Sequence, residues 1–401
     1  MLYATLDSAL HLPCGAVMKN RLVKSPMSDS LGNGKGDPSA AQIRLYEQWA
    51  QGGAALSVIG EAQVDQRYPE KPGNLVLGLG SNRQALQELT RRATVDGAHL
   101  WPQLGHAGAL AHAPISTAKG PSRLNLKDLQ CEALSIQEIQ RLPSQFAQSA
   151  RLAQDVGFTG VLIHAGHGFL LSQFLSPLFN QRTDDFGGSI ENRSRIILQT
   201  ILAVRLAVGP SFPVGIRINS SDLLEGGLTE SDALQVINML DNTSIDLIDI
   251  SGGTYFPGAP ASSDGNMDGG AYFLSFAQQA KQHTTIPLIL TGGFKRQVQA
   301  VNAMATGSID MVGVARAMIL NPKLPLAWLQ QPYSDPEFPR FQQPPAGGVT
   351  AWYSMALVAL GEANSESSAD RPSLDLSSVL NAYEARDVQR CQPWLQHFLA
   401  S

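Results

Sequence analysis

The sequence has few cysteines, no excess of basic residues and no long apolar run, and each shortage excludes a class of protein. The three cysteines, Cys14, Cys131 and Cys391, lie far apart without a C-x-x-C pair, so we expect neither a disulfide framework nor a bound metal. A formal net charge of -5 offers no clustered basic surface for nucleic acid. With no secretory leader and no run of about twenty apolar residues, the chain is expected to be cytoplasmic and to stay out of membranes.

What the sequence does contain is an ordinary globular balance, with 43% hydrophobic and 16% charged residues in a chain of 401. From residue 22 to about residue 330, short β-branched apolar runs alternate with longer helical patterns, as in repeated βα units. The predicted strands are 22–27, 55–59, 99–104, 161–163, 214–218, 247–250, 288–290 and 309–314. The predicted helices are 39–49, 82–96, 136–156, 190–208, 230–240, 272–282 and 296–305.

Helix boundaries carry recognisable signals. Ser135 and Glu138 form a capping-box pattern, and Gly157 and Gly307 stand where helix C-terminal caps belong. Eight βα units favour an α/β fold closed into a (β/α)8 TIM barrel, with an open doubly wound sheet as the alternative.

The composition changes after the predicted barrel. Residues 331–401 are rich in Pro and Gln at first, then contain a helical pattern at 351–361 and a polar, Ser-rich segment at 364–373. We predict a barrel of residues 1–330 and a C-terminal extension of residues 331–401. The extension is expected to pack on the barrel or on a partner subunit, and the second arrangement would make the protein a homo-oligomer.

In such barrels the active site lies at the C-terminal ends of the strands. The residues at those eight positions are small or can form hydrogen bonds, which a purely structural barrel would not need. They are Ser28, Gly60, Gln103, His164 with His167, Arg217, Ser251, Gly292 with Gly293, and Ala315 with Arg316.

The last two strands carry the usual phosphate site of these barrels. Gly292 and Gly293 let backbone N–H groups approach an anion, and the Arg316 guanidinium can donate two hydrogen bonds to phosphate oxygens. The alternative for the two glycines is a tight turn. Gln103 and Arg217 suit the edge of a large polar heterocycle. The alternative for Arg217 is a salt bridge inside the barrel.

His164 and His167 admit three interpretations. They could bind a metal, but no third ligand lies at a customary spacing. They could form a structural hydrogen-bonded pair. We favour a pair of N–H donors that stabilise negative charge on a substrate oxygen.

Several motifs resemble the Old Yellow Enzyme family of FMN-dependent ene-reductases over residues 8–330. They are MKNRLVKSPMS at 18–28, QLGHAG at 103–108, IHAGHGFLLSQFLSPLFNQRTDDFGGSIENRSR at 163–195 and VGVARAMILNPKLP at 312–325. The resemblance implies non-covalent FMN, reduction by NADH or NADPH, and hydride transfer to an activated alkene. The small-molecule substrates would be enones, nitro compounds or quinones.

The resemblance also implies roles for individual residues. Two histidines, His164 and His167, would bind the substrate oxygen, and Phe169 and Tyr255 are expected to contact the substrate. The expected FMN-binding residues are Ser25, Pro26, Met27, Ser28, Gly60, Gln103, Arg217, Ser251, Gly292, Gly293, Ala315 and Arg316.

The chain departs from the family at two positions. Ser28 replaces Thr or Cys, which leaves a hydroxyl but excludes thiol-based redox tuning. Phe169 replaces the Tyr that would protonate the substrate α-carbon, so water, Tyr255 or Tyr68 would have to supply that proton. Alternatives are therefore a flavin-dependent isomerase or dehydrogenase, a nitro or quinone reductase, and a non-catalytic flavin-binding protein. A flavin-free aldolase-type barrel lacks a suitably placed lysine.

Overall fold

The computed structural model describes residues 4–259, 270–330, 332–363 and 371–398. Eight parallel strands form a closed barrel, because β3 pairs with β4 on one side and with β14 on the other. The predicted (β/α)8 barrel is thus confirmed, and the alternative of an open doubly wound sheet is wrong. The barrel strands are β3 (Leu22–Lys24), β4 (Leu56–Gln63), β6 (His99–Gly105), β10 (Val161–Ala165), β11 (Val214–Asn219), β12 (Leu247–Ser251), β13 (Leu288–Thr291) and β14 (Met311–Val314).

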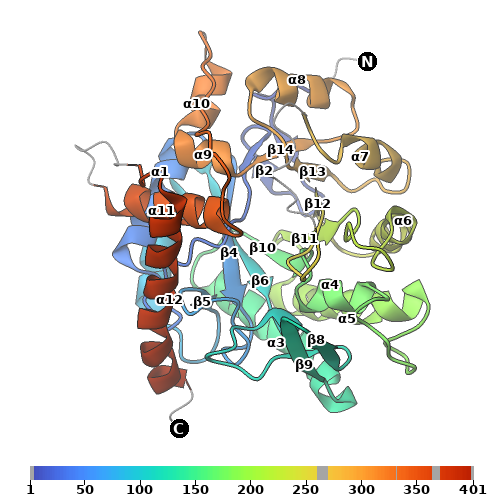
Figure 1. Ribbon diagram of the computed structural model, residues 1–401. Coiled ribbons are helices and arrows are strands. Elements are labelled where there is room, and N and C mark those ends of the chain that lie inside the picture. Colours follow the sequence, from blue (N-terminus) through green and yellow to red (C-terminus); the bar gives the residue numbers. More distant parts are fainter. Residues whose placement is uncertain (1–3, 260–269, 331, 364–370, 399–401) are drawn as a thin grey trace.

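Helices surround this barrel (Figure 1). The outer helices that follow the first seven strands are α1 (Ala40–Gln51), α2 (Arg83–Ala93), α3 (Ile136–Asp155), α5 (Ile190–Val208), α6 (Glu230–Leu240), α7 (Leu274–Ala280) and α8 (Gln297–Ala305). The shorter elements are α4 (Leu170–Leu175), α9 (Arg316–Leu320), α10 (Leu324–Leu329), β5 (Leu75–Val76), β7 (Lys119–Gly120), β8 (Leu124–Leu126) and β9 (Leu129–Ala133).

Local sequence signals explain most helix ends. The Ser135 hydroxyl accepts from Glu138 N at 3.2 Å and the Glu138 carboxylate accepts from Ser135 N at 2.8 Å, a capping box that stabilises α3 by about 1 kcal/mol. Gly157 and Gly307 follow α3 and α8 with positive φ, as predicted. Helix α2 ends before the predicted residue 96, because Asp96 adopts a φ of 54° that no helix accepts.

A hairpin of β1 (Leu10–His11) and β2 (Val17–Met18) closes the N-terminal end of the barrel. Leu10 and Met18 belong to one buried cluster with Val58 and Trp101, which come from the first halves of their strands. Trp101 is fully buried there. Since this end is filled by side chains, an open site is left to the opposite end, where the strands finish.

The C-terminal extension folds back on its own barrel. Helix α11 (Gly348–Glu362) lies beside α1, where Arg44 Nε donates to Gly361 O at 2.9 Å and Gln48 Nε2 donates to Leu360 O at 3.0 Å (Figure 1). Helix α11 contains the predicted helix 351–361, whereas α12 (Leu376–Phe398) was not predicted. Residues 364–370 of the predicted polar segment lie outside the described residues.

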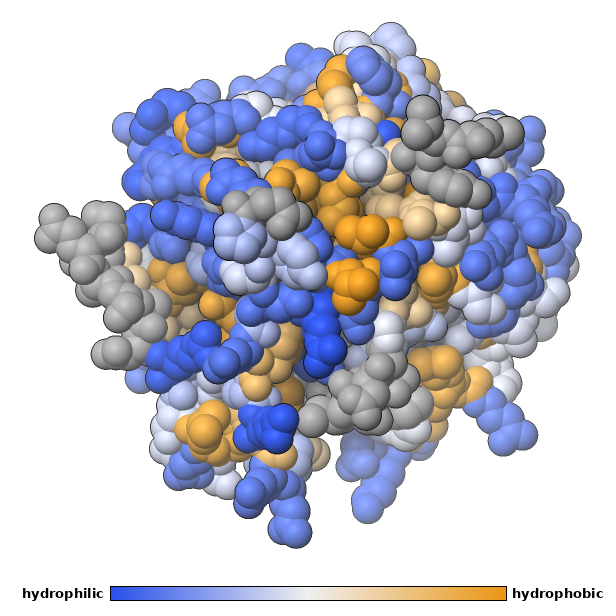
Figure 2. All heavy atoms as spheres, turned by 90° about the horizontal axis from the view of Figure 1, so that it is seen from above, coloured by the Kyte–Doolittle hydropathy of each residue, from blue (hydrophilic) through white to orange (hydrophobic). Residues whose placement is uncertain are grey.

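The outer surface of the protein is mixed in character. Hydrophilic side chains cover most of the face seen in Figure 2, and hydrophobic ones gather near its centre. Among the described residues, no helix has both the length and the apolar character that crossing a bilayer requires.

Candidate active site

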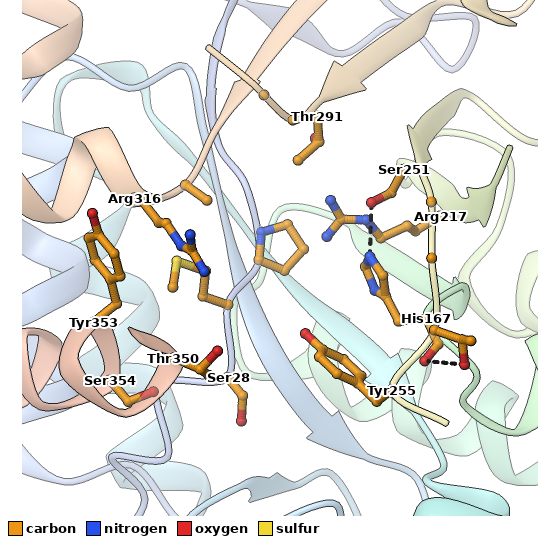
Figure 3. Close-up of a pocket in the computed structure, with 18 of the residues that line it drawn as sticks. Ser28, His167, Arg217, Ser251, Tyr255, Thr291, Arg316, Thr350, Tyr353 and Ser354 are labelled. Atoms are coloured by element: carbon orange, nitrogen blue, oxygen red, sulfur yellow. Dashed lines mark hydrogen bonds between the residues drawn. The ribbon is translucent and has the colours of Figure 1, made fainter. Parts of the chain in front are cut away.

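A cavity of about 630 Å³ lies at the C-terminal ends of the barrel strands, within the range of about 300–1,000 Å³ that small-molecule sites occupy. Side chains from several strand ends surround it (Figure 3). The extension contributes to its wall through Phe338, through Thr350, Tyr353 and Ser354 of α11, and through Tyr383 of α12. Sequence reasoning missed these extension residues, because nothing in their local pattern marks them as cavity-lining.

Most of the predicted site residues meet at this cavity. Those that line it are Pro26, Met27, Ser28, His167, Phe169, Arg217, Ser251, Tyr255, Gly292, Gly293, Ala315 and Arg316. Ser25, Gly60, Gln103 and His164 are not part of its lining and are buried behind it.

Two of these four buried residues shape the cavity wall from behind. A Cβ on Gly60 would lie 3.0 Å from Met27 N, so glycine lets β4 approach the segment that follows β3. Ser25 Oγ lies 2.9 Å from Thr291 Oγ1, which joins the ends of β3 and β13.

The two histidines form part of a hydrogen-bonded chain. His164 Nε2 lies 3.2 Å from His167 Nδ1. His167 Nε2 in turn lies 2.8 Å from Ser251 Oγ (Figure 3). Burial, followed by the positive charge of Arg217, lowers the pKa of both histidines well below the ordinary value. Both imidazoles are therefore neutral, and each carries a single N–H. Only His167 reaches the cavity.

Glu61 is a buried carboxyl group behind this chain that the sequence analysis did not single out. Its Oε1 lies 2.8 Å from His164 Nδ1 and accepts a hydrogen bond from Gln103 Nε2. Burial raises the pKa of Glu61 to about 8, although Gln103 and Arg217 oppose that rise. Its place directly after Gly60, at the end of an apolar run, is the signal that could have revealed it.

Arg217 has a buried partner on the neighbouring strand. Asp249 lies opposite Arg217 in the register of β11 and β12, with Arg217 Nε 3.3 Å from Asp249 Oδ2. Asp249 also accepts a hydrogen bond of 2.7 Å from Thr291. The internal salt bridge that was the alternative for Arg217 is present, yet the guanidinium also lines the cavity (Figure 3). The sequence signal that could have revealed this partner is Asp249 itself, a single acidic residue within the apolar run LIDIS.

The loop after β13 meets the start of α9 at one side of the cavity. Gly292 and Gly293 have φ of 128° and 86°, and a Cβ on Gly293 would collide with the carbonyl oxygen of Gly270. Arg316 lines the same part of the cavity, with its guanidinium 4.8 Å from the centre of the Tyr353 ring.

Phe169 and Tyr255 lie next to the histidines. Phe169 is 4% exposed, and its ring centre lies 4.8 Å from that of His164. The Tyr255 ring lies 5.9 Å from both His167 and Phe169, and its hydroxyl points into the cavity (Figure 3). Tyr68 is not among the cavity-lining residues; it stacks on His106 with ring centres 4.7 Å apart. Of the two tyrosines considered as proton donors, only Tyr255 faces the cavity.

These features fit the FMN that the sequence resemblance implies. The glycine pair leaves backbone open beside Arg316, as a phosphate requires. Gln103 Oε1 is buried and has no hydrogen-bond partner within the described part of the chain. An N–H group of a bound heterocycle would satisfy such an acceptor.

Comparison with known proteins places the chain in a family. Residues 15–332 match the NADH:flavin oxidoreductase / NADH oxidase family. The chain is 35% identical over 356 residues to the NADH-dependent flavin oxidoreductase iliE of Hypocrea jecorina, covering 81% of this chain and 88% of that protein. It is 30% identical to the NADH oxidase of Thermoanaerobacter brockii, where the match covers 77% of this chain but only 48% of the relative.

Solved structures share the barrel. A 2-naphthoyl-CoA reductase complex superposes with a TM-score of 0.75 at 26% identity, over 80% of this chain and 51% of that one. Morphinone reductase gives a TM-score of 0.72 at 23% identity, over 84% and 92% of the two chains, which shows a common fold. The chain therefore belongs to the NADH:flavin oxidoreductase / NADH oxidase family, the Old Yellow Enzyme family of its sequence motifs, and is an NAD(P)H:flavin oxidoreductase that uses FMN.

Proposed function

We propose that the protein reduces activated alkenes, such as α,β-unsaturated carbonyl compounds, at this cavity. The observation that carries the proposal is the neutral histidine pair, in which His167 lines the cavity together with Arg217 and Phe169 and His164 lies directly behind His167. Neutral imidazole N–H groups stabilise the negative charge that develops on a carbonyl oxygen when a hydride reaches the β-carbon.

The FMN would be held by residues that line the cavity and by Ser25, Gly60 and Gln103, which are buried behind its wall. Gln103 and Arg217 would bind the pyrimidine edge, and the positive charge of Arg217 would favour an anionic reduced ring. When bound, FMN supplies to the substrate a hydride that it has received from NADH or NADPH. The remaining FMN-binding residues would be Ser25, Pro26, Met27, Ser28, Gly60 and Ser251 along the ring, and Gly292, Gly293, Ala315 and Arg316 at the phosphate.

His164 and His167 would bind the substrate oxygen together. Their facing nitrogens lie 3.2 Å apart, so one N–H is engaged within the pair. A substrate oxygen must therefore replace that contact before both rings can donate to it. This exchange replaces one hydrogen bond within the pair by two to the substrate oxygen, and its cost is the reorientation of the two rings.

A second candidate function, nitro or quinone reduction, is favoured by Phe169. This residue is packed in a cluster with Tyr68, Ala107 and Ala111 and has no exchangeable proton to give to carbon. Nitro groups and quinones accept hydride without protonation of a carbon atom. An isomerase would instead return the hydride to the cofactor.

One experiment separates these functions. The FMN-loaded protein is reduced anaerobically with 4-deuterated NADH or NADPH and then mixed with 2-cyclohexenone or with 1,4-benzoquinone, while the flavin absorbance is recorded. The alkene reductase oxidises with cyclohexenone and places deuterium on the β-carbon of cyclohexanone. Oxidation by benzoquinone alone would refute the alkene proposal and support the second candidate.

A matched pair of variants tests the histidine role. His167→Ala should slow oxidation by cyclohexenone at least tenfold, because a hydrogen bond to an oxygen that becomes negatively charged in the transition state is worth about 1.5–3 kcal/mol. His283→Ala, at an exposed histidine outside the cavity, is the control. Equal behaviour of the two variants would count against the proposed oxygen site.

The same proposal assigns residues 1–330 to the FMN-binding barrel and residues 331–401 to an extension that completes the cavity wall. It is supported by the extension residues in the cavity lining, which are Phe338, Thr350, Tyr353, Ser354 and Tyr383. We also propose a cytoplasmic location, where NADH and NADPH are available, and a small-molecule substrate in place of nucleic acid or lipid.

A further inference from the structure

A second carboxyl group, Glu70, lines the cavity on the side of Ser28. Ser28 Oγ donates to Glu70 Oε2 at 2.6 Å, and Asn74 Nδ2 donates to the same oxygen at 3.2 Å. Asn74 is in turn fixed by Gln63 and by the backbone N–H of Lys71. The carboxyl group is therefore held in one position at the cavity surface by residues that do not themselves titrate near neutral pH.

Few charged groups surround Glu70, and they act on its pKa in opposite directions. Lys71 is its cationic neighbour, and Lys71 Nζ is already paired with Asp387 of α12 at 3.1 Å. Burial raises the pKa of the Glu70 carboxyl, while Lys71 and the Ser28 hydrogen bond lower it. Glu61 raises it further once Glu61 is itself ionised. Tyr255 and Tyr383 are the titratable hydroxyls that its charge reaches. Glu70 thus retains its proton to a higher pH than an exposed glutamate does.

Other acids of the site are less suited to donate a proton. Glu61 is engaged with Gln103 and His164 and does not line the cavity. Tyr255 is 66% exposed, and its phenol is a weaker acid than a carboxyl group. A carboxyl group whose pKa has moved upward toward the working pH is the better general acid.

We propose that Glu70 is the acid that protonates the substrate α-carbon, in place of the tyrosine that Phe169 replaces. The inference rests on the proposed alkene reduction. After hydride addition to the β-carbon, the electron pair of the former double bond resides on an enolate. That pair forms the new α-carbon–hydrogen bond as the Glu70 O–H bond breaks. The resulting carboxylate is stabilised by Ser28, Asn74 and Lys71, and it takes a proton back from water.

The experiment compares how fast the reduced enzyme is oxidised by 2-cyclohexenone and by 1,4-benzoquinone. In Glu70→Gln, an isosteric change without a titratable proton, the ratio of the two rates should fall by about 10² to 10⁴-fold. Glu132→Gln, at an exposed carboxylate 3.8 Å from Arg123, is the control and should keep the wild-type ratio. Adding Phe169→Tyr to Glu70→Gln should restore cyclohexenone oxidation, because a phenol then occupies the family's position.

One further readout does not depend on turnover: infrared difference spectra across a pH titration should lose one carboxylic-acid carbonyl band in Glu70→Gln. In addition, wild-type oxidation by cyclohexenone should slow as the pH rises past that titration. A wild-type ratio in Glu70→Gln, or a fall confined to Tyr255→Phe, would overturn the proposal. Failure of the wild-type protein to oxidise with cyclohexenone would instead refute the alkene reductase function itself.

Discussion

Glu61→Gln is the substitution whose effect on stability can be worked out most fully. Burial raises the pKa of Glu61 to about 8 from an ordinary value of 4.5, so the folded protein binds this proton more tightly than the unfolded chain does. The stabilisation is fully present below pH 4.5 and is lost as the pH rises towards 8. Glutamine does not titrate, and the variant should lack this pH dependence.

The magnitude follows from the two pKa values. One pKa unit corresponds to about 1.36 kcal/mol, so the full effect between pH 4.5 and 8 is about 5 kcal/mol. Between pH 5.5 and 7.5 the wild type should lose about 2.5 kcal/mol relative to the variant. With an unfolding entropy of about 2.1 cal/mol/K per residue, that loss lowers the melting temperature of this chain by about 3 °C.

The assay is thermal unfolding followed by circular dichroism at several pH values. Neutral His164 and His167 change stability in the opposite direction with pH, but they are present in both proteins and largely cancel in the comparison. A melting-temperature difference between wild type and Glu61→Gln that stays constant from pH 5.5 to 7.5 would refute a neutral, buried Glu61.

Three other substitutions test separate features. Gly293→Ala should weaken FMN binding at least tenfold in a fluorescence titration. The control Gly209→Ala has a similar φ of 81° but no atom within 4 Å of a new Cβ, and it should bind FMN normally. Equal affinities of the two variants would contradict the phosphate assignment. Asp249→Asn leaves Arg217 as a buried unpaired charge and should destabilise the protein by about 3–5 kcal/mol in denaturant unfolding, and a loss under 1 kcal/mol would contradict this account. Trp394→Ala removes a fully buried ring and should cost about 3–5 kcal/mol locally, seen as faster hydrogen exchange in α12; unchanged exchange would show that the ring does not anchor that helix.

The barrel could be predicted because its information is local. Apolar runs at regular intervals, capping boxes and C-terminal glycines each act within a few residues, and each appears in the structure near the predicted place. Strand ends converge in any closed parallel barrel, so listing their residues was enough to find eight cavity-lining positions without knowing the packing.

The rest depended on contacts between distant parts of the chain. Glu61 and Asp249 are noticed only when His164 and Arg217 are placed beside them. Glu70 gains its place from Ser28, 42 residues away. Helix α12 lacks a strong apolar face, so its sequence pattern does not predict it. It is held by individual contacts such as the hydrogen bond of 3.1 Å from Trp394 Nε1 to Gln66 O, which joins distant parts of the chain.

The C-terminal extension forms one side of the cavity at the end of the barrel. Helix α11 packs beside α1. Helix α12 brings Tyr383 to the loop that carries Lys71, and Lys71 Nζ lies 5.2 Å from the centre of the Tyr383 ring. Arg390 of α12 also donates to the backbone oxygen of Ser30, close to Ser28 in the chain. The cavity wall therefore includes residues beyond the family-matched region, which ends at residue 332.

Anaerobic titration of the purified protein with NADH and NADPH, followed by flavin absorbance, tests the central claim most directly. The structure predicts one non-covalent FMN per chain, loss of its visible absorbance with one equivalent of at least one nucleotide, and its return on adding 2-cyclohexenone. A colourless protein that cannot be reconstituted with FMN, or a bound flavin that neither nucleotide reduces, would contradict the account.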